Sequence, residues 1–204
     1  MKTQKINSIK TLTTSILVAI LLTIAACVDK QRNLDKEEVH SSVSESKPES
    51  KSKPPSMDIH TAALMGNLET IQQHIKAGTN LNVREQYGAA TPLITAATFG
   101  KTEVAKSLIE AGADLNSKNK EGSTALHVAA FFCRTEIVKA LLEKGADKSL
   151  KNNYGSTALK TVSGTFKDVK PIYEQIAKQL GHLGLKLDYE HIEMTRPKIA
   201  EVLK

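Results

Sequence analysis

The chain has 204 residues, of which 40% are hydrophobic, 25% charged and 4% aromatic, and it contains no Trp. These fractions predict one soluble domain with appended segments and argue against a protein with many membrane spans. The formal net charge of +6 falls to +3 once Lys2, Lys5 and Lys10 are set aside, so the basic balance does not imply nucleic-acid binding.

The first 26 residues have the order of a secretory signal peptide. The three lysines precede a run from Leu12 to Ala26 that carries no charge. This run is too short for a comfortable membrane span, and its place after a basic segment is typical of a cleaved targeting signal. We therefore expect residues 1–26 to be removed from the mature protein.

The end of this segment, Ile24-Ala25-Ala26-Cys27, resembles a bacterial lipobox. The resemblance implies that Cys27 becomes the acylated first residue and holds the protein on a lipid membrane. Each buried CH₂ of an acyl chain contributes about 0.8 kcal/mol, so two or three chains give an effectively permanent anchor. Val28 favours the outer membrane, facing the periplasm, whereas Asp29 leaves inner-membrane retention open. An ordinary cleavage site with an incidental cysteine is the alternative.

Residues 27–57 are rich in Ser, Lys, Pro and Glu and poor in apolar side chains. Such a composition cannot bury enough apolar surface to fold, so we predict a disordered linker behind the lipidated residue. Its expected span is about 30 Å as a coil and about 100 Å when fully extended. The linker is therefore long enough to hold a folded domain clear of the lipid surface.

From about residue 58 the sequence repeats itself. Thr91-Pro92-Leu93, Thr124-Ala125-Leu126 and Thr157-Ala158-Leu159 follow one another at intervals of 33 residues, and an upstream copy around His60 lies 34 residues before its counterpart. Each copy combines a threonine that can cap a short helix, an amphipathic second helix and a glycine that can end it. We predict helix pairs at residues 58–65 and 68–76, 92–99 and 102–110, and 125–132 and 135–143.

These motifs resemble the ankyrin-repeat family, whose signature has the form Thr-Pro-Leu-His-x-Ala-Ala. The copy at residues 91–97 departs from the signature at the His position, and the copy at residues 124–130 departs from it at the Pro position. The resemblance implies an all-α solenoid of about four helix-turn-helix repeats over residues 58–163. In such a solenoid each repeat packs only on its neighbours.

The period breaks after Thr157. A short helix at residues 157–162 is expected, followed by Gly164 and an apolar pattern at Ile172, Ile176 and Leu180. The segment 196–203 looks like the second helix of a repeat. Residues 164–204 are therefore expected to form a divergent terminal repeat or helical cap, with residues 164–190 as an insertion or an extra helical hairpin.

No catalytic motif stands out. The sequence has no Gly-rich phosphate loop, His-Glu-x-x-His, Cys-x-x-Cys or nucleophile elbow, so we predict no enzyme activity, cofactor or metal. His60 and His127 hold the signature position, where a hydrogen bond to loop backbone is expected rather than metal binding. Cys133 takes the place of Gly66 and Gly100 in the other repeats and is interpreted as a small turn residue, with a nucleophile as the alternative.

The expected binding face is a row of large side chains. Met65, Phe99 and Phe132 stand at the same position of three successive first helices. The ankyrin resemblance implies that partners contact this region and the adjacent turn tips. The candidate partner-binding residues are Met65, Tyr87, Phe99, Lys120, Phe132 and Tyr154, with Arg84 beside them. The alternative is that the Met and Phe side chains turn inward and fill the core.

The favoured function is a monomeric, membrane-tethered module that binds an unidentified protein partner in the bacterial envelope, and no nucleic acid. One alternative is an immunity or inhibitor protein directed at a toxin. A less favoured alternative is an enzyme that uses the C-terminal segment or Cys133.

Overall fold

The computed structural model describes residues 53–204. The signal peptide, Cys27 and most of the expected linker, at residues 1–52, lie outside the described residues. No β-strand occurs between residues 53 and 204, and none of the helices there is both long and apolar enough to cross a membrane. The helices are, in chain order, α2 (Ile59–Met65), α3 (Leu68–Lys76), α4 (Pro92–Phe99), α5 (Thr102–Glu110), α6 (Ala125–Phe131), α7 (Thr135–Glu143), α8 (Ala158–Val162), α9 (Phe166–Leu180), the 3-10 turn η1 (Gly181–Leu183) and α10 (Tyr189–Leu203).

Side-chain caps fix the start of three first helices. The hydroxyl oxygens of Thr91, Thr124 and Thr157 accept hydrogen bonds from the backbone N–H three residues later, at 3.3, 3.5 and 3.3 Å. Pro92 holds the first position of α4, where its missing N–H leaves no bond unmade. Because these caps satisfy the first backbone donors, the helices of 8 and 7 residues begin where the sequence predicts, and the helix of 5 residues begins one residue later, at Ala158.

Glycine ends two of the first helices and also makes room for the next repeat. Gly66 and Gly100 adopt φ angles of 78° and 64°. A Cβ added at Gly66 would lie 2.9 Å from Cδ of Lys101, and one added at Gly100 would lie 2.8 Å from the guanidinium of Arg134. Cys133 takes the same left-handed conformation in the third repeat, with φ 55°, so the predicted turn position is confirmed.

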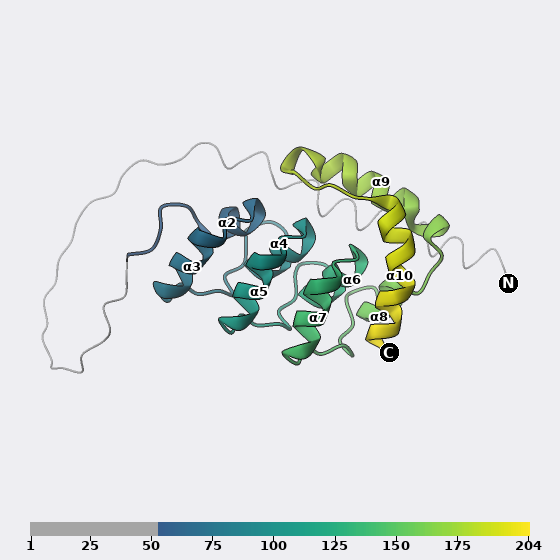
Figure 1. The fold of residues 1–204 in the computed structure, drawn as a ribbon, viewed down its shortest axis with the longest axis horizontal. Coiled ribbons are helices and arrows are strands. Elements are labelled where there is room, and N and C mark those ends of the chain that lie inside the picture. Colours follow the sequence, from purple (N-terminus) through teal and green to yellow (C-terminus); the bar gives the residue numbers. More distant parts are fainter. Residues whose placement is uncertain (1–52) are drawn as a thin grey trace, which may run out of the picture.

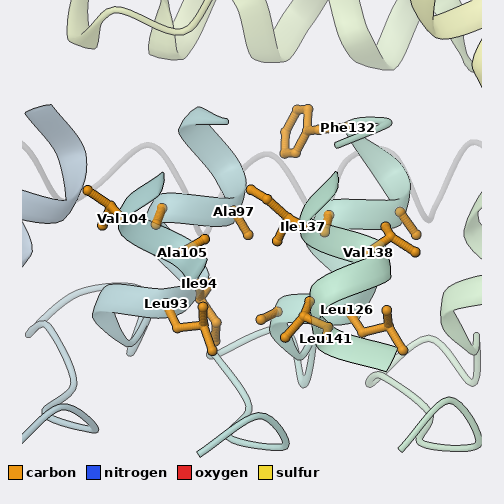
Figure 2. Close-up of a cluster of buried hydrophobic side chains, with 14 of the residues drawn as sticks. Leu93, Ile94, Ala97, Val104, Ala105, Leu126, Phe132, Ile137, Val138 and Leu141 are labelled. Carbon is orange, nitrogen blue, oxygen red and sulfur yellow. The ribbon is translucent and has the colours of Figure 1, made fainter. Parts of the chain in front are cut away.

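The helix pairs stack side by side in two layers (Figure 1). First helices α2, α4, α6 and α8 pack on one another in order, as do second helices α3, α5 and α7. Alanine pairs such as Ala96 and Ala97, both 0% exposed, let adjacent helices approach closely. Leu126 and Leu141, whose burial the pattern predicts, are 1% and 0% exposed and lie in the cluster of Figure 2. The expected all-α solenoid is confirmed.

An insertion splits the fourth repeat. Helix α8 packs on α6 as a first helix does, and α10 packs on α8 in the place of a second helix. Ile199 and Leu203 of α10 are 1% and 3% exposed and have the same spacing as the buried pair Ile137 and Leu141 of α7. Helix α9 and η1 therefore lie, in sequence, between the two helices of one repeat.

Helix α10 is longer than the sequence pattern predicts. It begins at Tyr189 rather than near Arg196, because the carboxylate of Asp188 caps it by accepting a hydrogen bond from the His191 N–H at 3.0 Å. The added turns bury Ile192, which is 2% exposed. Burial of this apolar side chain stabilises α10 at a length greater than that of the other second helices.

Helix α9 runs back along the array, above α8, α6 and α4 in Figure 1. Tyr173, which is 0% exposed, fastens it: its hydroxyl donates to the Phe131 carbonyl at 2.5 Å and accepts from Nη1 of Arg196 at 2.8 Å. In the preceding repeat the carbonyl at this register position, that of Thr98, accepts directly from Arg134 at 3.4 Å. The Tyr173 hydroxyl thus lies between an arginine of the fourth repeat and a carbonyl of the third. The corresponding arginine and carbonyl of the third and second repeats, Arg134 and Thr98, are hydrogen-bonded directly.

Candidate functional site

The long turns before the first helices are built alike. We call residues 83–91, 117–124 and 150–157 fingers 1, 2 and 3. In finger 2 the side-chain oxygen of Asn119 accepts from the Ser123 N–H at 2.8 Å, and in finger 3 the side-chain oxygen of Asn152 accepts from the Ser156 N–H at 3.1 Å. Glu85 replaces these asparagines in finger 1, where its carboxylate accepts hydrogen bonds from backbone N–H groups, including that of Ala90 at 3.2 Å. Each finger is therefore held by its own side chain.

Neighbouring fingers are also hydrogen-bonded to each other. The Lys120 N–H donates to the Gly88 carbonyl at 2.7 Å, and the Asn153 N–H donates to the Glu121 carbonyl at 3.0 Å. These bonds fix the register between the fingers. Glu121 and Tyr154 consequently hold the same position of fingers 2 and 3, and the corresponding acceptor in finger 1 is Gly88, one residue after Tyr87.

A groove of about 320 Å³ lies between fingers 2 and 3, the first helices and α9. Its floor includes Val128 and Phe131 of α6, while Glu121 and Tyr154 line it from the fingers. The opposite wall is apolar and comes from α9, through Val169, Ile172, Ile176 and Leu180. The groove is therefore polar on one side and apolar on the other, which suits a ligand with both characters.

His127 of α6 lines the groove, and its imidazole is in the neutral form. Its Nε2 lies 2.9 Å from the Ser156 carbonyl and its Nδ1 lies 2.9 Å from the hydroxyl of Thr124. Burial lowers the pKa of this imidazole below its ordinary value. The predicted hydrogen bond to loop backbone is confirmed for His127. Both ring nitrogens of His60 are buried without such a partner among the described residues, and finger 1 beside it contains one extra residue.

The comparison with known families follows this architecture. A family model described as ankyrin repeats, in three copies, matches residues 59–160, half of the chain. The chain belongs to the ankyrin-repeat family. Ankyrin repeats are typical of non-catalytic modules for protein–protein interaction. No curated protein matches the chain.

Three of the predicted site residues lie on the fingers of the ankyrin array. Tyr154 is half-buried and lines the groove, and Lys120 is exposed at the tip of finger 2. Tyr87 is half-buried on finger 1, outside the residues that line the groove. Of these three, the structure therefore brings only Tyr154 to the groove.

The predicted row of Met65, Phe99 and Phe132 is not uniform. Met65 is 63% exposed and Phe99 is half-buried, but Phe132 is only 7% exposed. The ring of Phe132 packs edge-on against Phe131 with centroids 5.0 Å apart, on the side of the array nearest the C-terminal segment (Figure 2). The expectation of an open row is wrong at Phe132, because its ring packs against Phe131 and lies 6.0 Å from the Arg134 guanidinium. The part of Phe132 that stays accessible lines the groove.

Cys133 has the environment of a structural residue. It is 3% exposed, and its thiol donates a weak hydrogen bond to the Ile192 carbonyl at 3.7 Å. Burial raises the pKa of this thiol to about 11, so the reactive thiolate is scarce at neutral pH. Cys27, the predicted lipidation site, lies outside the described residues. Within residues 53–204 no group of His, Cys, Asp or Glu side chains is placed to hold a metal ion.

The sequence reading missed Glu121 and the wall contributed by α9. The 33-residue period places Glu121 at the same position as the predicted Tyr154, so a comparison of fingers 2 and 3 could have found it. The apolar spacing of Ile172, Ile176 and Leu180 did predict a helix. It did not place that helix over α6, because the insertion has no counterpart in the other repeats.

Proposed function

We propose that this ankyrin-repeat chain is a protein-binding module that acylated Cys27 holds on a membrane of the bacterial envelope, and that its partner docks in the groove. The observation that carries the proposal is the groove itself, which joins two fingers, the first-helix layer and α9 in one concave site. We place the anchor in the outer membrane, facing the periplasm, from the residues that follow Cys27.

The lining of the groove favours a protein segment as the occupant. Phe131 and Tyr154 supply aromatic surface, and Asn119, Lys160 and Thr161 add polar groups around it. Buried aromatic surface ringed by polar groups is the usual composition of a protein-binding hot spot. The array also offers further surface beyond the groove, since Met65 and half-buried Phe99 lie on the neighbouring repeats.

The linker between Cys27 and the repeat array is long enough for the proposed arrangement. Helix α2 begins at Ile59, so 31 residues separate it from Cys27. A coil of that length spans about 30 Å, comparable to the size of a small domain. A partner could therefore reach the groove while the acyl chains remain in the lipid.

Replacing the anchoring residue tests the membrane part of the proposal. We expect wild-type protein to pellet with membranes and to incorporate labelled fatty acid, whereas Cys27→Ser should do neither, because serine cannot form the thioether. Cys133→Ser serves as the control, since it removes the other cysteine and should leave both properties unchanged. Soluble, unlabelled wild-type protein would overturn the proposed anchor.

The binding part requires that a partner contact the groove. Site-directed cross-linking from Tyr154 in cells tests it, because this side chain lines the groove from finger 3.

A further inference from the structure

Glu121 is a half-buried carboxylate that lines the groove without a counter-ion. Within residues 53–204 its carboxylate forms no ion pair. Burial raises the pKa of this carboxyl above its ordinary value, and the charge of Glu85 acts in the same direction, while a hydrogen bond from its own backbone N–H and the charge of Lys120 oppose them. A cation bound next to Glu121 would therefore stabilise the charged form of its carboxyl, which burial disfavours.

An aromatic ring stands in register with this carboxylate. Tyr154 occupies the position of finger 3 that Glu121 occupies in finger 2, and the Asn153-to-Glu121 backbone bond of 3.0 Å joins the two fingers beside them. Both side chains line the same groove. A carboxylate next to a tyrosine is a suitable site for an ammonium or guanidinium group, which gains from charge pairing with the carboxylate and from cation–π attraction when it lies over the ring face.

The apolar part of the groove favours a ligand that carries an apolar side chain next to the cation. Ile172 and Val169 are half-buried and face Val128 and Phe131 across the groove. A cavity of about 320 Å³ has room for one or two side chains. Lys120 of finger 2 and Lys160 of the groove lining are both exposed, so water screens their charge more effectively than that of Glu121.

We propose that the groove selects a protein segment in which a lysine or arginine stands next to an aliphatic or aromatic residue, with Glu121 and Tyr154 holding the cation and α9 covering the apolar side chain. This inference rests on the proposed function and adds the chemistry of the partner. Glu121 is then the residue that determines specificity for charge.

Selection from a phage-displayed library of random nonapeptides tests the inference with the full-length protein in detergent micelles. We expect the selected peptides to be enriched in Lys or Arg beside an apolar residue. Glu121→Gln should weaken the best peptide about tenfold, the effect of losing one charge-assisted hydrogen bond in a half-buried site. Glu110→Gln, which alters an exposed carboxylate at the end of α5, should leave its affinity unchanged.

A charge reversal keeps the test decisive if the Gln variant is poorly folded. Glu121→Lys should shift the selection toward peptides with Asp or Glu, while thermal melting followed by circular dichroism checks folding. Peptides without charge preference, or equal affinity for wild type and Glu121→Gln, would overturn this inference and leave the proposed function standing. Failure to select any peptide whose binding depends on Tyr154 would overturn both.

Discussion

At the scale of single residues, Phe99 and Phe132 show how one register position can serve two roles. Both stand at the C-terminal end of an alanine-rich first helix, at the same repeat position. Phe132 is 7% exposed because its ring packs against Phe131 and Arg134, whereas Phe99 is half-buried. Sequence register fixes where such side chains lie along the array. It does not say which of them their neighbours bury.

Truncating the two rings separates these roles. Phe132→Ala should lower the free energy of unfolding by about 3 to 5 kcal/mol, because it leaves a cavity in the core. Phe99→Ala should cost less than about 2 kcal/mol, since its ring is already partly in water. Urea unfolding followed by circular dichroism measures both. Equal losses for the two variants would contradict the assigned burial.

At the scale of elements, the shape of the groove depends on one helix, α9, that has no counterpart in the other repeats. Helix α9 buries Tyr173, Ile176 and Leu180 and forms the apolar wall of the groove. Its attachment uses a buried relay in which Arg196 donates to the Tyr173 hydroxyl, which in turn donates to the Phe131 carbonyl. The position of α9, and with it the shape of the groove, therefore depends on a hydroxyl group.

Removing that hydroxyl tests the relay. Tyr173→Phe keeps the ring but leaves two buried groups unpaired, so we expect α9 to lose about 1 to 3 kcal/mol of stability. Hydrogen exchange should become faster in α9 and stay unchanged in α5, which lies in another repeat. Tyr189→Phe, on a half-buried tyrosine of α10, is the matched control and should change neither. Unchanged protection of α9 in the Tyr173 variant would show that apolar packing alone holds the helix.

At the scale of the whole molecule, the repeated helix pairs were predictable with their bounds, whereas the part that occurs once was predictable only as a helical insertion in the last repeat. The 33-residue period, the threonine caps and the glycine turns specify the helix pairs through local interactions, so residues 58–143 could be read from the sequence. The packing of α9 depends on contacts of Tyr173 with Phe131 and Arg196, which lie 42 and 23 residues away from it in the sequence. The early start of α10 depends on the Asp188 cap and on the burial of Ile192. Of the two walls of the groove, the sequence predicted only the one formed by the fingers, through Tyr154.

The central claim is that a protein partner occupies the groove between the fingers and α9. Its most direct test places a photo-cross-linking amino acid at one position at a time in the full-length protein in cells. Tyr154 and Ile172 sample the two walls of the groove, and Lys139 and Glu110 are matched exposed positions on the outer helices α7 and α5. We predict a discrete protein adduct from Tyr154 and Ile172 and none from Lys139 or Glu110. Adducts from the outer helices alone, or none from either wall of the groove, would contradict the account.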